Sequence, residues 1–360
     1  MMKWIKKISP LLLILVVLTG CQPKVESKDQ YRNEFFEYFD TVTIVIGYTD
    51  SQEQFNTYFD EIKSEFKTYH ELYDIYNNYD GVNNVKTIND QAGIAPVKVD
   101  DKIIDMILFS KEWYEKTNGK ANIAMGSVLN LWHETRDAGK DDPDNAALPL
   151  IEDLEEANKH TNLDDVIINM EEKTVFLKDP DMLLDVGAVA KGYATEMITD
   201  YMKEEGFESF IISAGGNVKS IGKPLDGVRE KWGVGIQNPD TSFFVNMDSL
   251  DTVFGNDISV VTSGDYQRYY YVGDKAYHHI IDNETLMPGD EFKAVTVIME
   301  DSGLADFMST TVFLSSLEKG KEMLSKIDNA YAVWVTHDNE ILMSDGLEPY
   351  LKSLGATNGK

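Results

Sequence analysis

The chain has 360 residues and a formal net charge of −29, with 62 acidic and 33 basic side chains. So acidic a balance excludes a nucleic-acid-binding protein, because phosphates need a basic face. The residues are 42% hydrophobic and include 16 Phe, 18 Tyr and 5 Trp, which is enough apolar surface for one large core. We find no internal repeat and no long linker.

The first twenty residues have the pattern of a targeting segment. Three lysines among the first seven residues precede an apolar run at 11–18 that is too short to span a bilayer. Leu18-Thr19-Gly20-Cys21 follows and resembles a bacterial lipobox, in which the cysteine receives a diacylglyceryl group and the chain is cleaved just before it. We therefore expect residues 1–20 to be a lipoprotein signal peptide; a secretory peptide with a chance cysteine is the alternative.

Cys21 would then anchor the mature protein to the outer, extracytoplasmic face of the cell membrane. It is the only cysteine, so no internal disulfide can form. Removing residues 1–20 takes away three lysines and no acid, which moves the net charge from −29 to −32 and leaves no basic patch for the membrane. The anchor must be the lipid on Cys21, with several acyl chains, palmitate among them. We expect residues 21–33 to be a tether and residues 34–350 to be the folded domain.

The predicted elements mix strands and helices irregularly. The β-branched stretch 41–48 predicts a strand, and apolar spacing predicts amphipathic helices over 51–72 and 100–116. After them we expect an exposed loop at 137–149, a hairpin of 163–168 with 174–177, and a helix at 189–205 that ends at Gly206. The strands expected next lie near 209–213, 217–221, 232–236, 258–262, 267–272 and 294–299. Helices at 304–315 and 318–326 and strands near 330–335 and 340–344 complete the predicted chain. Because there is no strict βαβ alternation, the pattern predicts a single compact α+β domain of mixed sheets and helices.

Five short segments carry residues suited to chemistry, and the first two combine small residues with a strand end. In 184–194, Asp185 ends a strand, small residues open a helix and Lys191 lies in its first turns. Free N–H groups at a helix start favour phosphate. In 211–218, Gly215-Gly216 permits a positive φ or the close approach of a cofactor. Packing explains the first segment at least as readily, and a tight turn explains the second equally well.

The third and fourth segments, 261–270 and 277–282, bring two of the six histidines close to charged residues. A neutral imidazole suits proton transfer near pH 7, and a neighbouring carboxylate, Asp265 or Asp282, can fix its tautomer. Because adjacent strand residues face opposite sides, only one of His278 and His279 is expected to point into a site. A surface histidine without a chemical role is the alternative.

The fifth segment, 305–312, places Asp306 and Thr310 four residues apart at the start of a helix. That spacing puts their oxygens on one face, one turn apart. A carboxylate and a hydroxyl completed by phosphate oxygens form a ligand set suited to Mg²⁺. Taken alone, Asp306 is also explained as an acid that interacts with the helix dipole.

In this order the segments resemble the ApbE family, the FAD:protein FMN transferases, over roughly residues 35–345. In addition, 39–44 resembles the opening strand of that family, and 119–132 resembles its segment beside the flavin. The resemblance implies an Mg²⁺-dependent transferase that cleaves FAD, attaches FMN through a phosphoester to a threonine or serine of an extracytoplasmic acceptor protein, and releases AMP.

The resemblance also implies a role for particular residues. Asp306, Thr310 and the backbone carbonyl of Ala188 would hold the metal. His279 would lie near the diphosphate, where it assists deprotonation of the acceptor hydroxyl or contacts FAD. The residues implied to contact FAD are Phe39, Tyr76, Ala121, Asn122, Ile123, Asp185, Lys191, His279 and Ile280. The chain departs from the family pattern at Phe39-Asp40, Ala121-Asn122 and Asp282-Asn283, where the family usually has Met-Gly, Phe-Asp and Asp-Pro, so altered flavin contacts are expected.

Two other functions are compatible with parts of this pattern. One is an Mg²⁺-dependent FAD pyrophosphatase that gives free FMN and AMP, since water and an acceptor hydroxyl attack the same phosphorus. The other is a non-enzymatic flavin-binding lipoprotein, against which the presence of Asp306, Thr310 and His279 argues. The tail 355–357 faintly resembles an acceptor motif but has Leu351 where that motif needs an acid, so we expect a disordered terminus.

Overall fold

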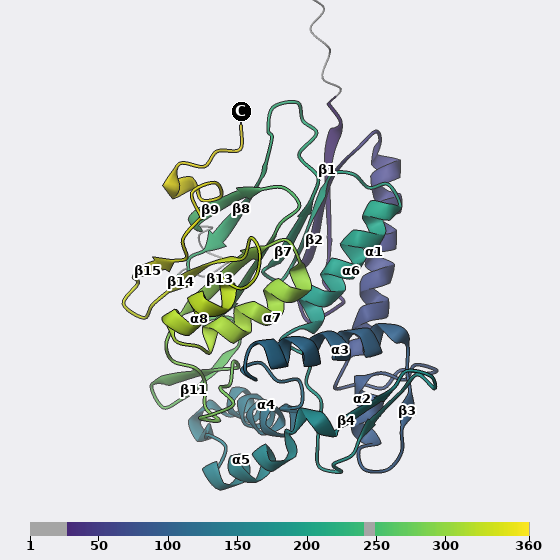
Figure 1. Ribbon diagram of the computed structural model, residues 1–360, viewed down its shortest axis with the longest axis vertical. Helices are drawn as coiled ribbons and strands as arrows, with labels where there is room; N and C mark the ends of the chain where they lie inside the picture. The colour runs from purple at the N-terminus through teal and green to yellow at the C-terminus, as the bar shows by residue number, and fades with distance from the viewer. Residues whose placement is uncertain (1–26, 241–248, 360) are drawn as a thin grey trace, which may run out of the picture.

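The computed structural model describes residues 27–240 and 249–359 and contains a large antiparallel sheet (Figure 1). The eight strands run in the order β1-β2-β6-β7-β10-β13-β14-β15, and every pair of neighbours is antiparallel. Their bounds are β1 Asp29–Phe35, β2 Thr43–Thr49, β6 Phe210–Ala214, β7 Asn217–Ile221, β10 Ser259–Gly264, β13 Ala294–Met299, β14 Tyr331–Val335 and β15 Ile341–Met343. The predicted α+β class is confirmed.

Four helices cover one face of this sheet: α1 Gln52–Tyr73, α6 Ala190–Glu204, α7 Ser302–Phe313 and α8 Leu317–Leu324 (Figure 1). The helix α1 forms where predicted, because its apolar residues recur on one side and Ser51 caps it by accepting the N–H of Gln54 (3.2 Å). The main hydrophobic core lies between these helices and the sheet and includes the fully buried Phe66, Phe307 and Trp334. Burial of each such side chain stabilises the fold by about 1.5–3 kcal/mol.

The other face of the sheet is covered by the strand pair β8 (Trp232–Gln237) and β9 (Ser249–Gly255) and by the C-terminal segment. Leu351 is fully buried in this second core, and the 3₁₀ turn Lys352–Leu354 follows it. The carbonyl of Asn358 accepts the N–H of Glu230 (2.7 Å). The expectation of a disordered terminus is therefore wrong for the described tail, because these contacts hold it against β8 and β9.

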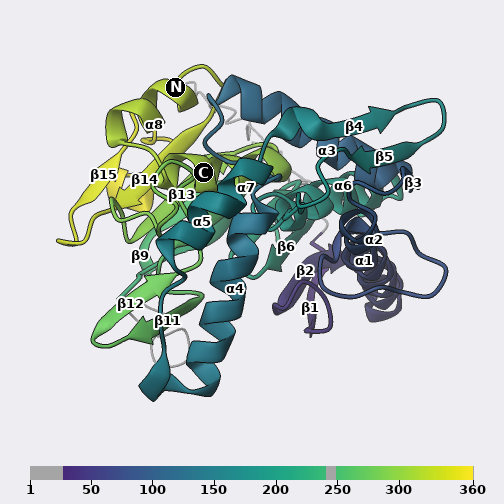
Figure 2. The ribbon, with the colours of Figure 1, turned by 90° about the horizontal axis from the view of Figure 1, so that it is seen from below.

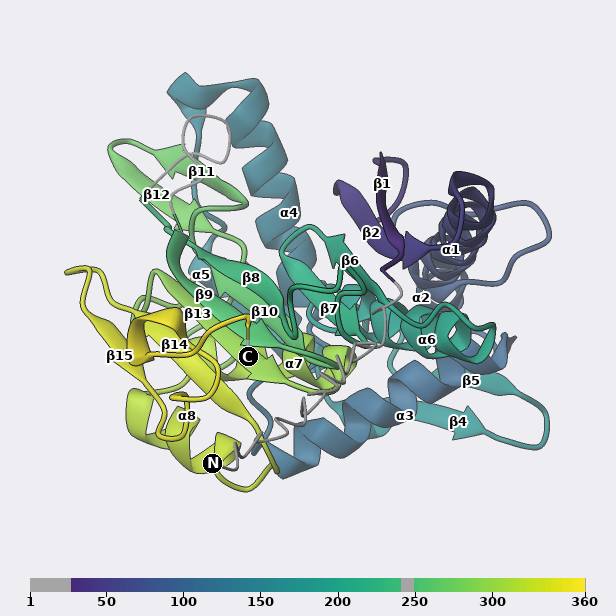
Figure 3. The same ribbon diagram turned by 90° about the horizontal axis from the view of Figure 1, so that it is seen from above.

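The remaining elements form a layer below the sheet in the view of Figure 1. They are α2 Val85–Asp90, β3 Val97–Lys98, α3 Asp101–Lys116, α4 Gly126–Asp141, α5 Ile151–Ala157, β4 Val166–Asn169, β5 Thr174–Leu177, β11 Tyr269–Val272 and β12 Lys275–His278, with 3₁₀ turns at Pro143–Asn145, Asn158–His160 and Leu163–Asp165. The helix α4 lies beside the β11–β12 hairpin (Figures 2 and 3), where Trp132 and Tyr270 share a third core.

Two predicted boundaries are wrong. Residues 29–33, expected in the tether, belong to the edge strand β1, whose mostly exposed polar residues give no alternating apolar signal. The loop expected at 137–149 begins inside α4, which continues to Asp141. The glycine at 139 suggested a break, but it serves close packing: a Cβ there would lie 2.8 Å from Cδ2 of Tyr270. Within the described residues, no helix is both long and apolar enough to cross a membrane.

Candidate functional site

Asp306 lies where the helices α6 and α7 meet. The helix α7 is capped by Asp301, which accepts the N–H of Leu304 (2.8 Å), and Asp306 follows one turn later with only 7% of its surface exposed. Its Oδ2 accepts the N–H of Gly192 (2.7 Å), and its Oδ1 lies 3.7 Å from Nζ of Lys191. Burial raises the pKa of Asp306, while Lys191 and the N–H of Gly192 oppose that rise. The two helix starts therefore hold one buried carboxylate between them.

The start of α6 depends on a glycine. A Cβ at Gly192 would lie 2.3 Å from Cβ of Asp306 and 2.4 Å from the carbonyl oxygen of Ser302, so no larger residue fits. Because the N–H of Gly192 donates to Asp306, the carbonyl of Ala188, four residues earlier, has no helical hydrogen bond from it in the described part of the chain. That carbonyl is therefore available as a hard oxygen ligand, on the turn that precedes the Gly192 contact with Asp306.

Thr310 lies one turn beyond Asp306 on α7 and is partly buried. Its Oγ1 is 3.4 Å from Oγ of Ser263 on β10, and that hydroxyl in turn bonds Oγ of Ser309 (2.7 Å). A carboxylate, a carbonyl and a hydroxyl are oxygen donors of the kind that Mg²⁺ prefers. The residues predicted as metal ligands therefore fit the metal chemically, and the α6–α7 contact brings Asp306 against the turn that carries Ala188.

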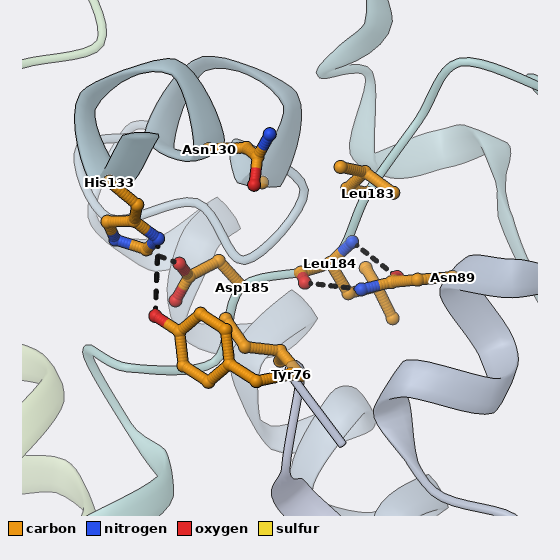
Figure 4. A pocket seen from close by; sticks show the side chains of 9 residues that line it. Tyr76, Asn89, Asn130, His133, Leu183, Leu184 and Asp185 are labelled. Atoms are coloured by element: carbon orange, nitrogen blue, oxygen red, sulfur yellow. Dashed lines mark hydrogen bonds and ion pairs between the residues drawn. The ribbon is translucent and has the colours of Figure 1, made fainter. Parts of the chain in front are cut away.

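A pocket with a volume of about 50 Å³ lies beside the turn that carries Asp185 (Figure 4). The hydroxyl of Tyr76 is 3.2 Å from Nδ1 of His133, and Nε2 of His133 is 3.8 Å from Oδ2 of Asp185. Oδ1 of Asp185 accepts the N–H of Gly187 (2.9 Å). The pocket is lined by Ile75, Tyr76, Asn89, Gly126, Asn130, His133, Leu183, Leu184 and Asp185.

The segment 121–123 lies next to this pocket but presents little side chain to it. Ala121 and Ile123 are buried in the main core, and the side-chain amide of Asn122 donates to the carbonyl of Thr161 (2.9 Å). The carbonyl of Ile123 accepts the N–H of Asp185 (2.8 Å), so the segment supports the pocket through its backbone. The FAD contacts that the resemblance implies for this segment stay a prediction.

Phe39 and Tyr76 are connected by a chain of hydrogen bonds. Phe39 has a positive φ of 55°, and its N–H donates to Nδ1 of His70 (3.4 Å). Nε2 of His70 is 3.3 Å from the hydroxyl of Tyr79, which donates to Oδ2 of Asp74 (2.6 Å). Oδ1 of Asp74 accepts the N–H of Tyr76 (2.6 Å). Burial alone would raise the pKa of Asp74, but the groups that donate hydrogen bonds to it lower the pKa, so its carboxylate stays charged. The same hydrogen bonds hold the loop in place.

His279 is held by a backbone carbonyl and not by a carboxylate. Its Nδ1–H donates to the carbonyl of Arg268 (3.2 Å), which leaves Nε2 as the acceptor. Burial, with the nearby charge of Arg268, lowers the pKa of His279 to about 3, so its ring is neutral at pH 7. The expectation that Asp265 or Asp282 fixes its tautomer is wrong, because Nδ1–H is bound to the carbonyl of Arg268 and Oδ2 of Asp282 pairs with Nζ of Lys120 (2.7 Å).

The neighbouring residues of His279 point into the protein. Nε2 of His278 donates to the carbonyl of Gly289 (2.6 Å), and its Nδ1 accepts the N–H of Ile280 (3.2 Å). The side chain of Ile280 is buried in the main core, with 6% of its surface exposed. Consequently His278 has a structural role, and Ile280 has no free side chain to offer a ligand.

Known proteins that resemble this chain identify the family to which its fold and site belong. The model of the ApbE family matches residues 40–334. This chain belongs to the ApbE family. The FAD:protein FMN transferase of Klebsiella pneumoniae (strain 342) is 33% identical over 261 residues, which cover 72% of this chain and 77% of that protein. The FAD:protein FMN transferase of Treponema pallidum is 29% identical over 281 residues, 75% of each chain.

Solved ApbE structures share the fold. The crystal structure of the ApbE protein from Thermotoga maritima superposes with a TM-score of 0.77 at 25% identity and covers 89% of this chain and 99% of its own. The flavin transferase ApbE from Vibrio cholerae has a TM-score of 0.71 at 18% identity, over 90% of this chain and 99% of its own, a likeness of fold alone. The family resemblance inferred from the five segments is confirmed.

Helix α4 contributes residues to this ApbE site that the motifs did not predict. His133 lines the pocket. Burial lowers the pKa values of His133 and His279, and the positive charges of Arg136 and of Arg268, on the segment before β11, lower them further. The same two charges oppose the rise that burial causes in the pKa of Tyr76. The sequence signal for these residues was that His133 and Arg136 lie one turn apart, close after Trp132. Because a loop was predicted from 137, the helix α4 that carries them was not recognised. Cys21, the expected lipid attachment site, lies outside the described residues.

Proposed function

We propose that this ApbE protein is an FAD:protein FMN transferase that uses Mg²⁺, attaches FMN to a threonine or serine of an acceptor protein and releases AMP. The observation that carries the proposal is the buried carboxylate of Asp306, which accepts the N–H of Gly192 on the turn after Ala188 and lies on the same helix as Thr310. A flavin-binding protein without a reaction needs no such set of hard oxygen donors at a helix contact.

The metal site and the helix start would act on the diphosphate of FAD. When bound, Mg²⁺ would neutralise charge on the diphosphate oxygens during phosphoryl transfer. Asp306, Thr310 and the carbonyl of Ala188 would hold it. Lys191, which lies 3.7 Å from Asp306 in the first turn of α6, would contact the same phosphate oxygens.

His279 would take the proton of the acceptor hydroxyl. Its Nε2 is the free acceptor because Nδ1–H is bound to the carbonyl of Arg268. The acceptor oxygen attacks the FMN phosphorus, the bond from that phosphorus to the bridging oxygen breaks, and AMP leaves with that oxygen. A general base with a pKa near the operating pH contributes roughly 10²–10⁴-fold. With a pKa of about 3 in the free protein, His279 is expected to contribute toward the lower end of this range.

The proposed location follows from the N-terminal sequence. A lipid on Cys21 would hold the enzyme at the extracytoplasmic face of the cell membrane, where its acceptor protein would also lie. The stretch 1–20 supports this through its lysines, its short apolar run and the lipobox pattern.

The test is a transfer reaction with a candidate secreted acceptor. Purified enzyme is incubated with FAD, Mg²⁺ and the acceptor, and intact-mass spectrometry follows the acceptor while chromatography follows AMP. We expect the acceptor to gain the mass of one FMN as AMP forms, and chelation of Mg²⁺ to stop both. Asp306→Asn, which keeps the size of the side chain, should stop them too. AMP and free FMN with an unmodified acceptor would instead indicate a pyrophosphatase.

A further inference from the structure

His133 joins two segments that lie far apart in the sequence. Its imidazole lies between the hydroxyl of Tyr76, on the loop after α1, and the carboxylate of Asp185, on the turn before α6 (Figure 4). The partly exposed ring is itself carried by α4. Three separate segments therefore meet at one side chain that belongs to none of the five motif segments.

The surroundings of His133 favour one tautomer. Oδ2 of Asp185 faces Nε2 at 3.8 Å, and a carboxylate in that position favours a proton on Nε2. Nδ1 is then an acceptor, so the hydroxyl of Tyr76 donates to it. Burial lowers the pKa of His133, although the negative charge of Asp185 opposes this shift. The lowered pKa keeps the ring neutral at pH 7. The Tyr76–His133 contact is therefore a directed hydrogen bond.

This bond determines where the ring of Tyr76 lies. The residue is 56% exposed, yet its hydroxyl end is directed inward, and burial raises the pKa of that hydroxyl to about 12. Asp74 fixes the backbone of the loop. Among the described residues, His133 is the side chain to which the Tyr76 hydroxyl is hydrogen-bonded, and the two rings are 5.9 Å apart.

The two rings also limit the space in the pocket. Tyr76 and His133 both line a volume of about 50 Å³. Sites for small organic ligands usually have about 300–1,000 Å³. A flavin nucleotide is larger than this volume, so the part of it that enters the pocket must displace a lining side chain, and Tyr76, which is 56% exposed, is placed to move outward.

We propose that His133 is a positioning residue that latches the Tyr76 ring across the pocket in the free protein, and that FAD binding opens this latch. The inference rests on the proposed function, because it takes FAD as the ligand of the pocket. The free energy that holds the latch closed opposes binding, so loss of the bond strengthens binding. For one neutral hydrogen bond, the expected gain in FAD affinity is about 2- to 10-fold.

Two amide substitutions separate the two sides of the imidazole. His133→Asn places a polar atom where Nδ1 lies and keeps the contact with Tyr76, whereas His133→Gln places one where Nε2 lies and loses it. Tyr76→Phe removes the same bond from the other side and keeps the ring. Affinity is measured by titrating FAD against each full-length variant through flavin fluorescence, with a chelator present so that no turnover occurs.

We expect His133→Gln and Tyr76→Phe each to bind FAD about 2- to 10-fold more tightly than the wild type, and His133→Asn, which keeps the bond to Tyr76, to show less of this gain. The double variant should gain no more than either single one, because both remove one shared bond. Unchanged or weaker binding in both single variants would overturn the latch, as would equal tightening by His133→Asn and His133→Gln. If wild-type protein binds no FAD either with the chelator or with Mg²⁺ present, the proposed function itself fails, which is a different outcome.

Discussion

At the scale of single residues, the environment of His279 changes the expected pH dependence of the reaction. Sequence alone suggested an imidazole that titrates near pH 7. Burial and Arg268 instead lower its pKa to about 3 in the free protein. The profile of kcat/KM reports groups of the free enzyme. We therefore predict no limb from His279 between pH 5 and 8 in kcat/KM for FAD. A limb near pH 6.5 that disappears in His279→Ala would contradict this environment.

The same shift predicts a contribution to stability. The folded-state pKa of His279 lies below the unfolded value of about 6.5, so the unfolded chain binds the proton first. Its contribution is fully present above pH 6.5 and is lost as the pH falls toward 3. In urea unfolding, His279→Gln should therefore lose less stability than the wild type between pH 7 and 5. Equal losses would contradict the low pKa. His278 is a poor control, since its two ring nitrogens bond Gly289 and Ile280.

At the scale of elements, the contact between α6 and α7 is the structural basis of the proposed metal site. Gly192→Ala would place a Cβ 2.3 Å from Cβ of Asp306 and force the helices apart. Overpacking of this kind costs about 1–3 kcal/mol. We predict a lower melting temperature and the loss of Mg²⁺-dependent FAD cleavage. The control is Gly320→Ala on α8, where the nearest atom would be 3.3 Å away. An active, stable Gly192→Ala variant would contradict the described packing.

How much of these elements the sequence predicts depends on how local their signals are. The helices around 51–72 and 189–205 were predictable, because apolar periodicity and capping residues lie within the segments themselves. The roles of residues 185–192 and 306–310 came from the family resemblance and stay predictions. Helix α4 was cut short, since Gly139 looks like a breaker until Tyr270 is seen against it. The role of His133 was not predictable, because it exists only through contacts with Tyr76 and Asp185.

At the scale of the whole molecule, a net charge of −29 opposes the binding of an anionic dinucleotide. Near the pocket, Arg136 and Arg268 offset part of this negative charge, since their positive charges contribute to the pKa values of Tyr76, His133 and His279. We predict that Arg136→Gln and Arg268→Gln each weaken FAD binding by about 2- to 5-fold, the worth of an exposed charge pair. Arg32→Gln, whose guanidinium bonds Glu34 on the edge strand, should not change it. Equal weakening by all three would indicate a general charge effect.

The proposed anchor can be tested on the whole chain in cells. If the lipid on Cys21 is what binds the membrane, Cys21→Ala should leave an uncleaved precursor or release an unlipidated protein. Fractionation followed by immunoblotting measures this. Normal membrane retention of a cleaved Cys21→Ala protein would contradict the lipobox interpretation.

The central claim is that a protein hydroxyl, and not water, attacks the FMN phosphorus. The most direct measurement is to run the reaction with FAD, Mg²⁺ and acceptor in water enriched in ¹⁸O and to weigh the products by mass spectrometry. Transfer breaks the diphosphate without using solvent. We therefore predict two products in equal amounts: the acceptor with FMN attached, and free AMP that contains no ¹⁸O. Free FMN carrying one ¹⁸O, beside an unmodified acceptor, would show that water is the nucleophile and would contradict the account.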